Sequence, residues 1–98
     1  MTLRIDPEQN ETRELKQAAN WKGQHVLEIG CGDGRLSRRL ARLGSQVHAI
    51  DPDAEMIRVA RQRLPKSFAS RVHFDVGKAG RLEYSRGTFD LIVFSWVL

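Results

Sequence analysis

The sequence predicts an α/β protein whose core is a doubly wound parallel sheet. Apolar segments typical of buried strands alternate along the chain with segments in which apolar residues recur at helical spacing. A strand that returns to the same sheet through a helix runs parallel to the previous strand, with a right-handed crossover. The four strands expected on this basis cover residues 26–29, 46–51, 71–76 and 89–94.

A glycine-rich turn directly after the first of these strands is the most informative local feature. Gly30, Gly32 and Gly34 occupy alternate positions, and glycine adopts positive φ angles and lets main-chain groups approach a ligand. The following segment, residues 35–43, has leucines at i, i+4 and i+7, as in a helix that packs on a sheet. The order strand, glycine turn, helix predicts a nucleotide-type site beyond the carboxyl ends of the strands.

Residues typical of helix ends predict two further helices, one before the first strand and one after the second. Asp6-Pro7, followed by acidic residues, predicts a helix that runs to about Asn20. We therefore expect an N-terminal helical segment over residues 1–22 and a binding core over residues 23–98.

The helix ends in that core are marked by glycine and proline. Gly44 is expected to cap the helix over residues 35–43 at its C-terminus. Pro52-Asp53 predicts the start of the next helix, and Pro65 stops it.

Length, composition and charge narrow the class of protein. A chain of 98 residues, 41% hydrophobic and 29% charged, fits one globular domain. The start of the chain has no apolar signal segment and no apolar run is long enough to span a bilayer, so a cytoplasmic location without membrane association is expected. A single cysteine excludes an internal disulfide, and no metal site is expected.

A net charge of +4 raises the question of nucleic-acid binding, which the arginine positions disfavour. The arginines of the two core helices fall opposite the apolar stripes, as on solvated helix faces, and no aromatic residues interleave with them. They are Arg35, Arg38, Arg39, Arg42, Arg58, Arg61 and Arg63.

The end of the chain predicts an exposed sheet edge. The last strand is apolar throughout and is followed at once by Trp96-Val97-Leu98, with no helix to cover it. A long apolar edge tends to pair with another strand. We therefore expect that the gene product continues, that the chain is a fragment, or that it forms a homo-oligomer through this fourth strand.

Asp51 is the candidate residue for binding a ribose. It ends the second strand about 20 residues beyond the glycine turn, where a carboxylate can accept hydrogen bonds from both ribose hydroxyls of a nucleotide cofactor. NAD enzymes and S-adenosylmethionine enzymes share this device. The spacing Gly30-x-Gly32-x-Gly34 departs from the dinucleotide fingerprint, and Glu28 before it would repel a pyrophosphate but suits an ammonium group.

These segments resemble the motifs of class I S-adenosylmethionine-dependent methyltransferases, in the family's order. Residues 26–34 are similar to the first motif, 47–53 to the second, 72–79 to the third and 89–98 to the fourth. The resemblance implies a Rossmann-like sheet with strand order 3-2-1-4, of which the C-terminal half is absent here.

The resemblance also implies a set of cofactor-binding residues. The backbone of Gly30, Cys31 and Gly32 would meet the methionine moiety, with Glu28 near its ammonium group and Ser95 close by. Asp51 would hold the ribose. The adenine would contact Pro52 and Met56 and the backbone of Lys78 and Ala79.

One position departs from the family pattern. An acidic residue usually stands where this chain has Lys78, and it accepts a hydrogen bond from the adenine amino group. Lys78 cannot accept that bond, so we expect weaker adenine discrimination or a substitute acceptor such as Asp75.

The function expected from these features is methyl transfer from S-adenosylmethionine, with S-adenosylhomocysteine as product, to a small-molecule acceptor. The catalytic base is not identified by the sequence. The alternatives are a non-catalytic module or fragment that binds S-adenosylmethionine and, less favoured, an NAD-binding domain.

Several residues with chemical potential are interpreted as structural. We expect Cys31 to be a small packing residue, and the histidines at 25, 48 and 73 lack metal-ligand spacing. Trp21 and Trp96 are expected to pack, Asp90 to begin a strand, and Glu28 alone would also suit a loop cap or an arginine partner.

Overall fold

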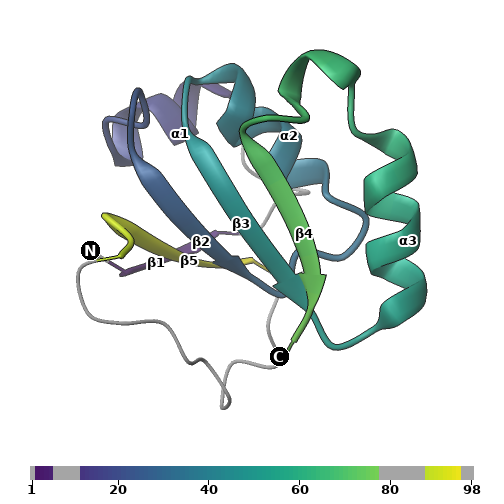
Figure 1. The fold of residues 1–98 in the computed structure, drawn as a ribbon. Coiled ribbons are helices and arrows are strands. Elements are labelled where there is room, and N and C mark those ends of the chain that lie inside the picture. The colour runs from purple at the N-terminus through teal and green to yellow at the C-terminus, as the bar shows by residue number, and fades with distance from the viewer. Residues whose placement is uncertain (1, 6–11, 78–87, 96–98) are drawn as a thin grey trace.

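The chain forms one parallel sheet with helices packed against it (Figure 1). The computed structural model describes residues 2–5, 12–77 and 88–95. The elements in chain order are β1 (Thr2–Ile5), α1 (Thr12–Ala18), β2 (His25–Ile29), α2 (Arg35–Arg42), β3 (Gln46–Asp51), α3 (Ala54–Arg63), a 3₁₀-helix (Lys66–Phe68), β4 (Val72–Val76) and β5 (Leu91–Ser95).

The sheet order is β1-β5-β2-β3-β4, and every neighbouring pair is parallel. The four strands that the sequence predicts are β2, β3, β4 and β5, so the expected order 3-2-1-4 and the α/β class are confirmed. The bounds of β3 match the prediction, and β5 begins at Leu91 rather than at residue 89.

A fifth strand at the N-terminus corrects the expectation of an entirely helical segment over residues 1–22. β1 pairs with β5 in a register that sets Thr2 beside Ile92 and Ile5 beside Ser95. β1 therefore occupies the edge of β5 that we expected to be exposed. The helical part of this segment is α1, and the predicted helix start at Asp6-Pro7 lies outside the described residues.

The three α-helices of the described residues pack on one face of the sheet; in Figure 1 α1 and α2 lie behind the strands and α3 stands beside β4. Side chains from alternate strand positions meet them there, because successive side chains of a strand point to opposite faces. The core on this face includes Leu15 and Trp21 from the α1 region, Leu36 and Leu40 from α2, Ile57 and Ala60 from α3, and Val26, Val47, Val72, Phe74 and Val93 from the strands. Trp21 packs as expected, and its Nε1 donates to the Leu15 carbonyl at 2.6 Å.

The opposite face carries a smaller apolar cluster. Leu27, Ile29 and Ile50 are its buried members, and the partly buried Phe89, Ile92 and Phe94 pack against them. The His48 ring meets Phe89 edge to face, and its Nε2 lies 3.0 Å from an Asp75 carboxylate oxygen. His48 therefore takes part in structural contacts on this face, in keeping with the sequence interpretation.

A side-chain cap and a glycine with positive φ fix two of the helix ends. Asp53 caps α3 by accepting from the backbone N–H groups of Glu55 and Met56, as Asp does at helix N-termini. Gly44 follows α2 with φ +95°, which confirms the glycine cap at this end.

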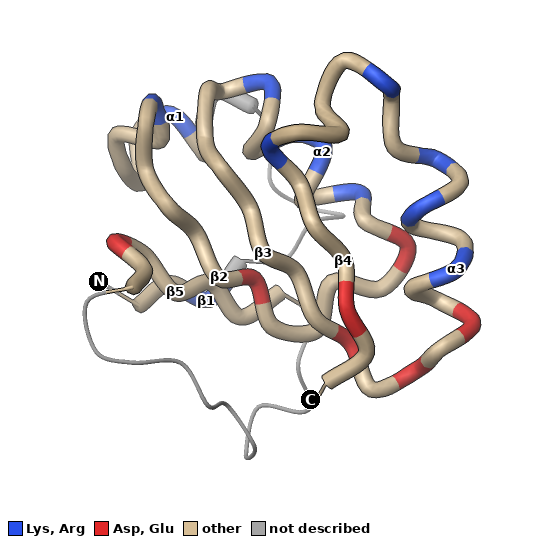
Figure 2. Tube along the Cα trace, in the orientation of Figure 1, with Lys and Arg blue, Asp and Glu red and all other residues tan. Residues whose placement is uncertain are grey.

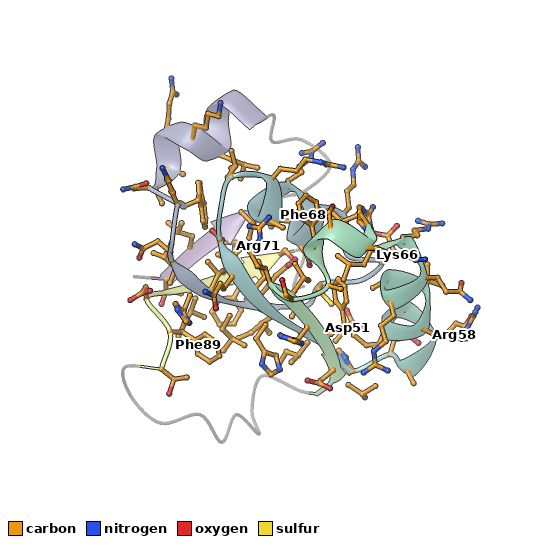
Figure 3. All side chains as sticks on the ribbon, turned by 45° about the horizontal axis from the view of Figure 1, so that its top comes forward. Asp51, Arg58, Lys66, Phe68, Arg71 and Phe89 are labelled. Carbon is orange, nitrogen blue, oxygen red and sulfur yellow. The ribbon has the colours of Figure 1, made fainter. Side chains whose placement is uncertain are left out.

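The arginines of α3 are exposed, as expected for a solvated helix face. Arg58 pairs with Glu55 on the helix surface and points outward in Figure 3. Arg61 reaches around the edge strand and donates to the Phe74 carbonyl at 2.6 Å, which satisfies an outward-facing group of β4. In the described part of the chain no helix combines the length and apolar character that a membrane span needs.

Candidate functional site

Acidic residues gather near the carboxyl ends of the central strands (Figure 2). Most lysines and arginines of the described part lie toward the opposite ends of the strands or along α3. Because ligands of parallel α/β sheets bind beyond the carboxyl ends, this distribution gives the expected ligand side a negative local field.

The glycine turn after β2 is fixed to the neighbouring strand. The backbone N–H groups of Gly30 and Cys31 both donate to the Ile50 carbonyl, at 2.9 and 3.0 Å. Gly34 closes the turn by donating to the Cys31 carbonyl at 3.0 Å. These bonds hold the turn directly over the end of β3.

Gly32 and Gly34 have different roles, although both have positive φ. An added Cβ at Gly34 would lie 2.9 Å from Phe74 Cζ, so this glycine is required by packing against α3 and β4. An added Cβ at Gly32 would have no atom within 4 Å, so it would point into open space. Gly32 therefore presents bare backbone at the surface, as a ligand cradle requires.

Asp51 ends β3 beside this turn and is partly exposed (Figure 3). One carboxylate oxygen accepts from the Gly32 N–H at 2.9 Å, and the other accepts from the Asp53 N–H at 2.9 Å. Each carboxylate oxygen can accept more than one hydrogen bond, so acceptor capacity remains for ligand hydroxyls. The structure thus brings Asp51, the residue predicted to bind the ribose, into direct contact with the glycine turn, whose backbone is predicted to contact the methionine moiety.

Glu28, by contrast, lies in the interior with 0% of its surface exposed. It stands between Ala49 of β3 and Val93 of β5, and its carboxyl group contacts the hydroxyls of Ser37 and Ser95. Burial is the main cause that raises the pKa of Glu28 from 4.5 to about 7. The resemblance set this carboxylate near the ligand ammonium, whereas here its contacts are with two serines.

Ser95 and Ser37 join three elements through that carboxyl group. Ser95 Oγ lies 2.7 Å from Glu28 Oε2 and 3.0 Å from the Gly30 carbonyl oxygen, so the predicted site residue Ser95 reaches the turn from β5. Sequence reasoning missed Ser37, which lies on the buried face of α2 with Leu36, Leu40 and Ala41. A hydroxyl at a position of the apolar stripe is the signal that could have indicated it.

The remaining predicted residues are distributed around this centre. Pro52 is exposed and Met56 is half-buried, and both lie where β3 passes into α3. Burial raises the pKa of the Cys31 thiol far above its ordinary value, so the thiol stays protonated, which argues against a nucleophile. Lys78 and Ala79 lie outside the described residues, as does Trp96.

Two acidic residues that could compete for the site have other partners. Asp75 lies 3.0 Å from His48 of the neighbouring strand β3 and 3.5 Å from Arg61. Asp90 accepts from the His25 N–H at 2.8 Å at the start of β5, as expected for a strand-entry residue.

A parallel sheet, a bare glycine turn and a carboxylate at the end of the adjacent strand define a nucleotide-cofactor domain of Rossmann-like type. Among such domains, the methyltransferase domain family has a profile that matches residues 26–98 of this chain. The chain belongs to this family, the class I S-adenosylmethionine-dependent methyltransferase domain.

Curated relatives include O-methyltransferases. The chain is 37% identical over 71 residues to magnesium-protoporphyrin O-methyltransferase of Rhodobacter capsulatus, covering 72% of this chain and 31% of that protein. It is 39% identical over 77 residues to ubiquinone biosynthesis O-methyltransferase of Methylocella silvestris, covering 79% of this chain and 30% of that protein. The match thus spans about a third of the length of these relatives.

Solved structures share the fold. Magnesium protoporphyrin IX methyltransferase from Synechocystis, determined with bound S-adenosylmethionine, aligns with a TM-score of 0.70 and 27% identity over 85% of this chain and 39% of that one. A methyltransferase structure from Listeria monocytogenes aligns with a TM-score of 0.76 and 22% identity, over 88% and 40% of the two chains. The second likeness concerns the fold alone.

Proposed function

We propose that this chain binds S-adenosylmethionine at the carboxyl ends of β2 and β3 and provides the donor half of a methyl transfer to a small molecule. The observation that carries the proposal is the contact between Asp51 and the Gly32 N–H beside an open glycine turn. A carboxylate fixed in this way is suited to a ribose diol, and the bare turn is suited to an amino-acid moiety.

The residues present fit the cofactor chemically. In this assignment Asp51 accepts hydrogen bonds from the ribose, the backbone from Gly30 to Gly32 contacts the methionine moiety, and Pro52 and Met56 pack on the adenine. The acidic character of this end of the sheet favours a ligand with a sulfonium and an ammonium charge. When bound, S-adenosylmethionine supplies an activated methyl group, so the protein's task is to orient it toward an acceptor and exclude water.

Calorimetric titration of the chain with S-adenosylmethionine, S-adenosylhomocysteine and NAD tests the proposal. We expect the first two ligands to bind and NAD to show no comparable affinity. Saturable NAD binding that excludes S-adenosylhomocysteine would contradict it.

Two matched variants locate the site. Asp51→Asn keeps the shape of the side chain but removes its charge, and we expect at least a tenfold loss of affinity, about 1.4 kcal/mol. Asp33→Asn is the control, because Asp33 also accepts a backbone N–H but pairs with Arg63 at 2.7 Å. We expect less than a threefold change for this control, and equal effects of the two variants would argue against a ribose role for Asp51.

A turnover assay separates a methyltransferase from a binding module. Small phenols and carboxylic acids are suitable acceptors, because the O-methyltransferase relatives point to oxygen as the acceptor atom. Methylated product above the uncatalysed rate supports the catalytic assignment, and donor binding without turnover on any acceptor supports the module.

A further inference from the structure

Arg38 of α2 is connected to the glycine turn through a rigid peptide unit. Its half-buried side chain donates from Nη1 to the Asp33 carbonyl at 2.9 Å. The N–H of that same peptide unit belongs to Gly34 and donates to the Cys31 carbonyl at 3.0 Å. Because a peptide unit is planar, its carbonyl and its N–H move together. Arg38 therefore helps to fix the direction in which the Gly34 N–H points.

A second peptide unit extends this connection to β3. The Cys31 carbonyl shares its plane with the Gly32 N–H, which donates to Asp51 Oδ2 at 2.9 Å. All three hydrogen bonds therefore run in one direction, from the guanidinium of Arg38 through two peptide units to the carboxylate of Asp51. Hydrogen bonds in such a chain strengthen one another, and charged groups at its two ends strengthen them further.

We propose that Arg38 is a positioning residue for the donor site, because it orients the Gly32 N–H and through it the Asp51 carboxylate. The inference rests on the proposed function, in which Asp51 binds the ribose. Arg38 acts from α2 through the backbone of the turn and needs no contact with the ligand.

The surroundings of Arg38 would otherwise favour a fully solvated side chain. Burial lowers the pKa of this guanidinium, and three neighbouring positive charges act in the same direction: Arg63, Arg42 and Arg35. Asp33 acts in the opposite direction. Partial burial of a charge costs free energy, and the hydrogen bond to the Asp33 carbonyl offsets part of that cost. Because this contact is with the main chain, Asp33→Asn leaves it in place.

Amide NMR of the free chain tests the connection without any ligand. In Arg38→Ala we expect the amide proton signals of Gly34 and Gly32 to move upfield, because the hydrogen bonds of both groups weaken. Arg42→Ala is the matched control, since Arg42 has the same charge one turn further along α2 and is exposed. Alanine favours the helix at both positions. Equal shifts of the two glycine signals in both variants would overturn the proposal.

Titration with S-adenosylhomocysteine tests the effect on the donor site. We expect a five- to tenfold loss of affinity in Arg38→Ala and less than a twofold loss in Arg42→Ala. Arg38→Lys keeps a charged donor, so its affinity should lie between those of Arg38→Ala and the wild type, and so should its glycine signals. An affinity of Arg38→Ala within twofold of the wild type would contradict the positioning role.

A double-mutant cycle separates positioning from a general structural role. In an Asp51→Asn background the chain of hydrogen bonds no longer ends on a charge, so Arg38→Ala should cost less than twofold there. A purely structural role of Arg38 would give the same five- to tenfold loss in both backgrounds, and that result would also overturn the proposal.

This inference and the proposed function fail separately. If the wild-type chain does not bind S-adenosylhomocysteine, the proposed function is wrong, while the glycine signals of the free chain still decide whether Arg38 orients the turn. If the ligand binds and Arg38→Ala behaves like Arg42→Ala, only the present inference falls.

Discussion

Glu28 and Asp51 are acidic residues at the ends of adjacent strands, yet the fold gives them opposite environments. Glu28 is the fourth residue of the five in β2 and is enclosed between β3 and β5, with serine hydroxyls as its partners. Asp51 is the last residue of β3, is partly exposed, and accepts from two backbone N–H groups. A shift of one position relative to the strand end therefore separates a buried acid from a partly exposed carboxylate.

The difference teaches that a position beside a glycine turn does not by itself decide whether an acidic side chain is exposed. Both side chains lie on the helix-covered face, because Ala49 of the core on that face is the sheet neighbour of Glu28 and stands two positions before Asp51. What distinguishes them is whether the strand continues past the residue far enough for its neighbours to cover it. Substitutions at these and neighbouring positions test this contrast.

Alanine substitution should lower stability much more at Glu28 than at Asp51. Glu28→Ala removes a buried side chain and leaves two serine hydroxyls without their acceptor, so we expect a loss of about 3 to 4 kcal/mol. Asp51→Ala exposes its N–H partners to water, so we expect only about 1 kcal/mol. Urea denaturation measures both losses, and equal losses would remove the contrast.

The pH dependence of stability should include a contribution from Glu28. Because the pKa of Glu28 is about 7 in the fold and 4.5 in the unfolded chain, its stabilising contribution is complete below about pH 4.5. It decreases as the pH rises to about 7, by up to about 3 kcal/mol. Denaturation curves from pH 4.5 to 8 for wild type and Glu28→Gln measure this difference, and parallel pH profiles would contradict it.

The two glycines of the turn extend the contrast to the backbone. Gly34→Ala adds a clash with Phe74 to the strain of a positive φ, so we expect about 2 to 3 kcal/mol of destabilisation. Gly32→Ala has only the backbone strain, about 1 kcal/mol, but its methyl group would occupy the ligand side.

Thermal unfolding together with titration by S-adenosylhomocysteine separates the two glycines. We expect Gly34→Ala to lower the melting temperature more and Gly32→Ala to lower affinity more, relative to its stability loss. The reverse ranking would place the open side of the turn elsewhere.

Substitutions of Asp53 should have the smallest effect on stability, and they serve as a control for a purely structural role. Its side chain caps α3, so Asp53→Ala should cost about 1 kcal/mol, whereas Asp53→Asn retains the cap and should cost less than half of that. Neither change should alter donor affinity more than threefold in a titration. A tenfold loss in Asp53→Asn would show that the ligand contacts this carboxylate directly.

Much of the fold could be predicted from the sequence because its signals are local. The alternation of apolar and amphipathic segments indicated β2 to β5, and Gly44 and Asp53 marked helix ends through their own backbone chemistry. β1 was missed because a strand of four residues has too short a pattern to recognise, and its pairing with β5 depends on residues about 90 positions away.

The site was predictable to a similar degree. The position of Asp51 beside Gly32 follows from strand ends that meet at one edge of a parallel sheet. The burial of Glu28 could not be read locally, because it depends on Ser95, which is 67 residues distant in the chain and becomes a neighbour only through the β2 and β5 pairing. Ser37 is only nine residues from Glu28 in the chain, and its hydroxyl on the apolar stripe of α2 was a local signal that the sequence analysis did not use.

Amide NMR during titration of the wild-type chain with S-adenosylhomocysteine tests the central claim most directly. The signals of Gly32 and Asp53, whose N–H groups donate to Asp51, should shift most, with that of Cys31 close behind. Those of Phe89 and Asp90, which directly precede β5, should stay in place. Shifts concentrated at Phe89 and Asp90, with Gly32 and Asp53 unchanged, would contradict a donor site at the carboxyl ends of β2 and β3.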